Sequence, residues 1–166
     1  KANAEVEFGN SLMISEQADG IIVNWKLTKD GAPSDSQELK PRIAKIQEDY
    51  GESTVKAVVT DRQFDSAENR AWLKEQNIYN GLCPRGPKEL KAKTGAKKFQ
   101  KLQKRRAQTE ARISILKNGF LGDPMSVKGF KNREQRVGWG VLAHNLWVIA
   151  RLEKVKEHEE DLAKAA

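Results

Sequence analysis

Residues 55–61, with the sequence VKAVVTD, give the clearest indication of the fold of this chain. They form a short apolar run rich in β-branched residues, which predicts a strand buried on both faces of a sheet, and Asp61 follows its carboxyl end. A second run with strand character covers residues 78–83. Between the two runs, Asp65 and Glu68 have the spacing of a capping box and predict the start of a helix. Strands that alternate with helices indicate an α/β fold.

The other elements follow from hydrophobic periodicity and from turn residues. Alternation of apolar and polar residues predicts a hairpin of two strands, over residues 6–14 and 21–27. Apolar residues that recur every three or four positions predict three helices, over residues 39–50, 97–118 and 132–157. Asp35 or Ser36 is expected to cap the first helix, with Pro41 in its first turn. Residues 85–96, around Gly86 and Gly95, are predicted to form a loop. In the last helix, Trp139 and Trp147 are expected to pack against the sheet.

Length and composition limit the function classes. A chain of 166 residues can form one compact domain, and 38% hydrophobic with 32% charged residues is typical of a soluble globular protein. Cys83 is the only cysteine and there are two histidines, so a disulfide framework and a multi-cysteine zinc site are excluded and a metal must be held by carboxylates. The longest apolar stretch, residues 137–152, is too short to span a membrane, and no signal peptide is visible. We therefore expect a cytoplasmic protein without membrane contact.

The positive charge is concentrated in one segment. Residues 85–118 contain 12 basic and 2 acidic side chains, whereas residues 1–84 contain 10 and 14 and residues 119–166 contain 8 and 7. A segment of net charge +10 attracts polyanions, and phosphate backbones are the usual ones. The sequence therefore favours a nucleic-acid partner, although a solvated basic helix is an equally good interpretation of a charge run.

Two acids are the candidates for chemistry. Gln103, Arg106, Glu110 and Lys117 have spacings that place them in one stripe of a helix, and Glu110 is the only acid between Lys91 and Asn118. Glu110 could hold a divalent cation, or it could form an intrahelical ion pair with Arg106. Asp61 could likewise be functional at the carboxyl end of its strand, or it could cap the next turn. Arg62 could bind a phosphate or pair with Asp65.

Several segments together resemble the C-terminal part of bacterial insertion-sequence transposases with a DDE catalytic domain. They are VVTDRQFDS at 58–66, CPR at 83–85, RRAQTEARISILK at 105–117 and AHNLW at 143–147, in the order found in that family. Arg106, Glu110 and Lys117 also match the last three members of a Tyr-x2-Arg-x3-Glu-x6-Lys signature known in some of these families, with Gln103 in place of the Tyr.

The resemblance implies a fold, an activity and a partner. The fold is ribonuclease H-like, a mixed sheet flanked by helices and here lacking its first strand, over residues 1–157, followed by a charged tail at 158–166. The activity is metal-dependent DNA cleavage and strand transfer in transposition, with Mg²⁺ or Mn²⁺ as cofactor. The partner is DNA, in a bacterial cytoplasm and without a membrane, and a homodimer in the DNA complex is compatible with this. The alternative is a non-catalytic DNA-binding remnant of a truncated transposase.

The resemblance also implies roles for individual residues. Asp61 is the second catalytic acid and Glu110 the third, both as metal ligands, whereas the first catalytic Asp is expected upstream of Lys1. Two groups of side chains would bind DNA. Arg106, Lys117 and Arg62 would contact phosphates near the reaction, and the basic helix would hold the duplex through Lys97, Lys98, Lys101, Lys104 and Arg105.

Overall fold

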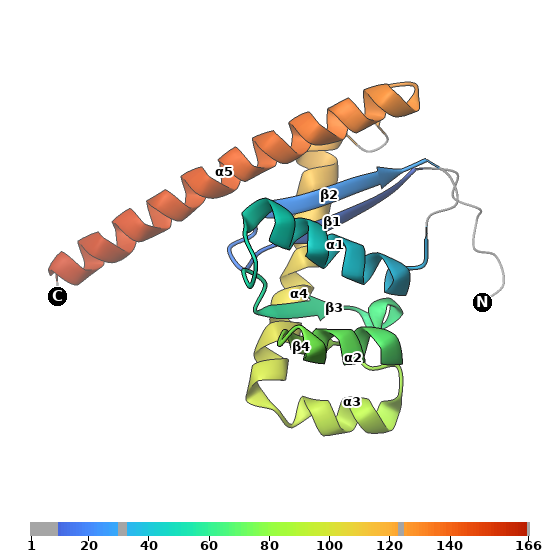
Figure 1. The fold of residues 1–166 in the computed structure, drawn as a ribbon. Coiled ribbons are helices and arrows are strands. Elements are labelled where there is room, and N and C mark those ends of the chain that lie inside the picture. The colour runs from blue at the N-terminus through green and yellow to red at the C-terminus, as the bar shows by residue number, and fades with distance from the viewer. Residues whose placement is uncertain (1–9, 30–32, 123–124, 166) are drawn as a thin grey trace. The chain divides into compact units, whose positions relative to one another are not determined.

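The computed structural model describes residues 10–29, 33–122 and 125–165, with residues 156–165 as backbone only. The chain divides into two compact units, one formed by Lys1–Ala32 with Ile115–Ala166 (unit 1) and the other by Pro33–Ser114 (unit 2). Each unit has its own hydrophobic core. The helices and strands of both units are labelled in Figure 1.

Unit 2 is built on a pair of parallel strands. Strand β3 (Ala57–Thr60) pairs with strand β4 (Tyr79–Leu82), which confirms both predicted strands, although the residues of β3 are half-buried and not fully buried. The 3₁₀ turn η1 (Arg62–Phe64) and helix α2 (Ala67–Glu75) connect the two strands. This is the strand–helix–strand order expected for a parallel pair.

The predicted caps of unit 2 were wrong. Ser66 caps α2 by accepting the Asn69 N–H, because buried Asp65 is occupied elsewhere, accepting the Arg85 N–H at 3.2 Å and pairing with Arg70. Helix α1 (Asp35–Tyr50) has Ser34 at its N-cap, one residue before the predicted candidates. Pro41 consequently lies inside α1 and not in its first turn.

Two further helices complete unit 2. Residues 85–96 were predicted to form a loop, yet they contain helix α3 (Pro87–Thr94), with Pro87 at the first helical position. Proline is favoured there because its fixed φ suits a helix and its missing N–H would have no partner. Helix α4 (Lys97–Ile115) follows almost at once. The core of unit 2 contains Leu39, Ile43, Leu73, Ile78 and Leu82, which come from α1, α2 and β4 or the residues beside them.

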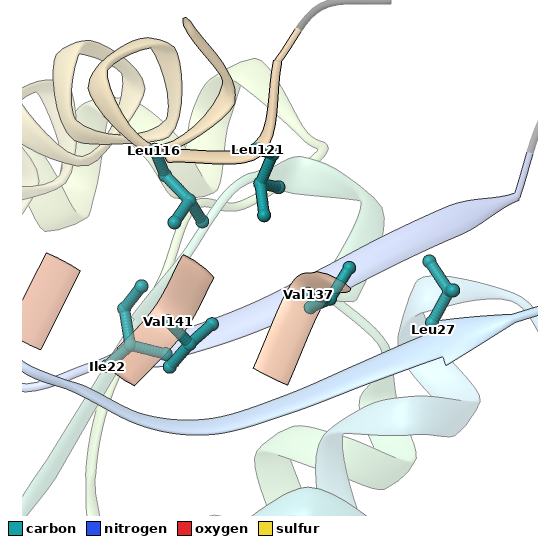
Figure 2. Close-up of a cluster of buried hydrophobic side chains, with 6 residues drawn as sticks. All are labelled: Ile22, Leu27, Leu116, Leu121, Val137 and Val141. Atoms are coloured by element: carbon teal, nitrogen blue, oxygen red, sulfur yellow. The ribbon is translucent and has the colours of Figure 1, made fainter. Parts of the chain in front are cut away.

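Unit 1 contains the predicted hairpin. Strands β1 (Ser11–Glu16) and β2 (Ile22–Thr28) pair antiparallel, whereas Val6 and Phe8 of the expected first strand lie outside the described residues. The π-helical segment η2 (Leu116–Leu121) follows α4 directly, and the long helix α5 (Phe130–Ala165) exceeds the predicted helix at both ends. Side chains from β2, η2 and α5 meet in one core, drawn in Figure 2 as Ile22, Leu27, Leu116, Leu121, Val137 and Val141.

The α/β class was predicted correctly, but the single mixed sheet was not found. The described residues form two separate sheets of two strands each, β1–β2 and β3–β4. Hydrophobic patterns identify strands one at a time and do not specify which strands pair. No helix within the described ranges is both long and apolar enough to cross a membrane.

Candidate functional site

Asp61 stands at the carboxyl end of β3, as predicted. It is the N-cap of η1, where its Oδ1 accepts the Gln63 N–H at 2.9 Å. The capping interpretation of Asp61 is therefore confirmed. Capping uses one carboxylate oxygen, and Oδ2 has no hydrogen-bond partner among the described residues, so this half-buried side chain keeps an oxygen for a ligand.

Helix α4 is fastened to this end of the strands by Gln103. Its Nε2 donates to the Gly81 carbonyl oxygen at 2.8 Å and reaches the Thr60 carbonyl oxygen at 3.5 Å, directly before Asp61. Phe99, one turn earlier on the same stripe, is buried. The stripe that contains Gln103, Arg106 and Glu110 is therefore the strand-facing one, and Glu110 lies about 10 Å further along α4.

Glu110 forms the ion pair that the sequence left open. Its Oε1 lies 3.6 Å from Arg106 Nη1, and the Glu110 side chain is 71% exposed. Such an exposed pair contributes little to stability, about 0.2–0.5 kcal/mol. Arg106 Nε is buried without a hydrogen-bond partner among the described residues. The Arg106 side chain as a whole is 33% exposed, so part of its guanidinium is accessible.

The other basic residues of α4 do not share the face of Glu110. At 100° per residue, all five lie about 110° or more from the centre of the strand-facing stripe. They are Lys97, Lys98, Lys101, Lys104 and Arg105, of which only Arg105 is not fully exposed. A duplex bound by these five side chains would therefore contact one face of α4, whereas Glu110 lies on another.

Lys117 is separated from Glu110 by a change of helix type. The predicted α-helix over 97–118 ends at Ile115, and Lys117 lies on η2 in unit 1. The wider π turn lets both Leu116 and Leu121 enter the core of unit 1, which explains the change. The stripe of Glu110 on α4 therefore ends before Lys117.

Three residues near Asp61 were not recognised from the sequence as site residues. Arg85 holds η1 in place, because its Nε donates to the Arg62 carbonyl oxygen at 3.0 Å and its Nη2 to the Gln63 carbonyl oxygen at 2.9 Å. Buried Asn69 donates to carbonyl oxygens of residues 36 and 64 and so joins α1 to η1. The CPR segment indicated the first residue, whereas nothing in the sequence indicated Asn69.

Asp35, at the start of α1, is the third missed residue. Burial raises the pKa of its carboxyl group, and the negative charges of Asp61 and Glu38 raise that pKa further. Asp35 and Asp61 are thus close enough to repel each other. Arg62 is exposed, and the partner of Asp65 is Arg70, with 3.7 Å between Nε and Oδ1. Of the two alternatives for Arg62, the pair with Asp65 is therefore not formed.

The donor chemistry of this region suits a hard divalent cation. Carboxylate oxygens are the ligands that Mg²⁺ and Mn²⁺ prefer, and Asp61 and Glu110 both offer oxygens without a backbone partner. Within the described ranges no group of three or more His, Cys, Asp or Glu side chains is close enough to form a metal site. The residues present therefore fit a metal ion in ligand type alone.

A family model for the transposase DDE domain matches residues 12–146 of the chain. This match includes both described strand pairs, α4 and the first part of α5. The chain therefore belongs to the family of transposase DDE domains. Neither a curated protein nor a solved structure matches it.

Proposed function

We propose that this chain is the part of a bacterial DDE transposase that supplies the second and third catalytic acids, Asp61 and Glu110, for DNA cleavage and strand transfer. The proposed domain has a ribonuclease H-like fold and spans residues 1–157. The observation that carries the proposal is Gln103, which links the Glu110 helix to Gly81 and to Thr60, the residue beside Asp61. This link brings two elements with distant positions in the sequence to the same end of one strand pair.

The two acids are the proposed ligands of Mg²⁺ or Mn²⁺. When bound, such ions activate a water or hydroxyl and stabilise the leaving oxygen of a phosphodiester. Asp61 contributes an oxygen from a carboxylate that the Gln63 N–H already orients. Asp35 adds negative charge beside it, which favours a cation at this place.

The first experiment measures Mn²⁺ affinity by calorimetry and plasmid nicking with Mn²⁺. The variants are Asp61→Asn and Glu110→Gln, each of which removes the charge and retains the shape of the side chain. Asp61→Asn also retains an oxygen that can cap η1, whereas Asp61→Ala loses both the cap and the metal ligand. Comparison of these two variants separates metal binding from folding.

We expect the wild-type chain to bind Mn²⁺ and both isosteric variants to lose this binding. Cleavage by the chain alone is expected to be weak or absent, because only two of three acids are assigned. Unchanged Mn²⁺ affinity in both variants would refute the metal role. Strong nicking that disappears in both variants would show that the expectation of weak cleavage is wrong and would support the enzyme. DNA binding without any Mn²⁺ affinity would favour a non-catalytic remnant.

The proposed DNA contacts fall into two groups. Arg106, Lys117 and Arg62 are proposed to contact phosphates near the reaction, and Lys97, Lys98, Lys101, Lys104 and Arg105 to hold the duplex. We expect affinity to fall steeply with salt, because each neutralised phosphate contributes a slope of about −0.9 in log Kobs against log salt. If each of the lysines at 97, 101 and 104 binds a phosphate, replacing all three with Gln should reduce the magnitude of the slope by about 3. A salt dependence that is flat in the wild type contradicts phosphate binding.

A further inference from the structure

Unit 2 has a second charged feature at the other end of its strand pair. An open hollow of about 550 Å³ lies beside Tyr79, the first residue of β4. Its lining includes Lys56, Arg70, Lys74 and Lys98, and it includes no acidic side chain. A concave surface lined by four cations and no anions has a positive potential.

Three of these four cations have no acidic partner. Arg70 is occupied by Glu89, at 2.6 Å, and by Asp65. Lys56, Lys74 and Lys98 make no ion pair with a described acid, and their side chains are exposed. The positive charge of the hollow is therefore not neutralised within the described part of the chain.

Three contacts involve residues that line the hollow. The Lys98 ammonium lies 4.0 Å from the centre of the Tyr79 ring, a cation–π contact that holds a flexible side chain over the strand. Asn80 Oδ1 accepts the Leu82 N–H at 3.0 Å and Lys93 Nζ at 3.2 Å. Because the amide oxygen is used, the amide of Asn80 has N–H donors to offer a ligand.

Ammonium groups together with an amide donor, in a hollow without carboxylates, recognise an oxyanion. We propose that this hollow binds a backbone phosphate of DNA. The proposal rests on the proposed function in that the ligand is the DNA of the transposase. Tyr79 pairs with Ala57, at the opposite end of β3 from Asp61, so the hollow lies about 13 Å from that acid along the strands.

This distance gives the hollow a role separate from the reaction. About 13 Å corresponds to about four base-pair steps along the axis of a duplex. A phosphate in the hollow is therefore not the phosphate at Asp61. The hollow would hold the duplex beside the reacting position and fix its register without reading sequence.

The test compares two double variants with the same change in charge. Lys56→Gln with Lys74→Gln removes two ammonium groups from the hollow. Lys88→Gln with Lys91→Gln removes two exposed lysines on α3 that do not line it. Binding of a labelled duplex is measured against salt in EDTA, so that no metal site contributes. In parallel, the Asn80 side-chain amide is followed by NMR during titration with duplex and with inorganic phosphate.

We expect the hollow variant to reduce the salt slope by about 1–2 and the α3 variant to reduce it less. The Asn80 amide resonances should shift with the duplex. If the wild type and both variants bind DNA with equal salt slopes, the hollow does not bind DNA, whereas the proposed DNA-binding function of the chain is retained. If inorganic phosphate shifts Asn80 and the duplex does not, the ligand is a small phosphate and the proposal is overturned. If the wild type does not bind DNA, the proposed DNA-binding function and this inference are both wrong.

Discussion

The two ends of the β3–β4 pair carry different charged groups. At the carboxyl end, Asp61 and Asp35 are close enough for one negative charge to raise the pKa of the other carboxyl group. At the amino end, Lys56, Lys74 and Lys98 surround a hollow without an acid. Strands of four residues separate the two ends. This difference is the basis of the two proposed ligands, a cation at one end and a phosphate at the other.

The largest effect is expected from Gly81→Ala, because both ends depend on the close approach of β3 and β4. A Cβ atom at Gly81 would lie 2.5 Å from the Val58 carbonyl oxygen and 2.8 Å from Val59 Cγ2. The strands would have to move apart, and overpacking of this kind costs about 1–3 kcal/mol of unfolding free energy. Urea denaturation measures the loss.

Gly95→Ala is the matched control in the same unit. Its Cβ would meet the Ala92 carbonyl oxygen at 3.7 Å, an ordinary contact. We expect Gly95→Ala to leave both Mn²⁺ binding and DNA binding as in the wild type. Equal stability of the two variants would show that the tight spacing of β3 and β4 does not support the two ends.

The second prediction concerns Asn69 and tests the two ends of the β3–β4 pair separately. Asn69 is buried and donates to the carbonyl oxygens of Ser36 at 2.8 Å and Phe64 at 2.9 Å. Asn69→Ala removes both part-buried bonds, each of which contributes about 0.5–1.5 kcal/mol. Because these bonds hold η1 against α1, Mn²⁺ affinity at Asp61 should fall in calorimetry.

DNA binding in EDTA should be unaffected by Asn69→Ala, because the residue does not line the hollow. Asn132→Ala provides the comparison, since that side chain donates only to the exposed Lys128 carbonyl oxygen. A parallel loss of metal and DNA affinity in Asn69→Ala would show that the ends are not independent. Stability equal to that of Asn132→Ala would show that the Asn69 bonds do not matter.

Local signals predicted the carboxyl end of β3 well. β-branched residues define the strand, and Asp61 follows it in both sequence and structure. The spacing of Gln103, Arg106 and Glu110 also predicted their shared stripe, because helical periodicity needs no tertiary information. The target of Gln103 could not be predicted, since the Gly81 carbonyl belongs to a strand 22 residues away.

The amino end was not predicted for a related reason. Lys56, Lys74 and Lys98 are dispersed in the sequence, and only Lys98 belongs to the basic segment. The run of basic residues therefore indicated α4 as the DNA-binding surface, although its lysines lie away from the stripe of Glu110. Trp139 failed in another way: it was expected to pack against the sheet, yet it is 69% exposed. Hydrophobicity on several sides of a helix does not show which side is buried.

The smallest effect on stability is expected from Arg106→Gln, and here the comparison with another ion pair is decisive. Arg106 and Glu110 form an exposed pair of i,i+4 spacing, as do Lys45 and Asp49 on α1. If Arg106 serves only this pair, then Arg106→Gln should cost about 0.2–0.5 kcal/mol in urea denaturation and leave DNA binding unchanged. Lys45→Gln, which removes the exposed pairs of Lys45 with Asp49 and Glu48, should likewise change stability little and leave DNA binding unchanged. We expect both variants to change stability little but only Arg106→Gln to reduce the salt slope of DNA binding, by about 1, because the partly exposed Arg106 guanidinium is proposed to contact a phosphate. Equal slopes for the two variants would leave Arg106 with a structural role alone, and the phosphate contact proposed beside Glu110 would then have to come from another residue.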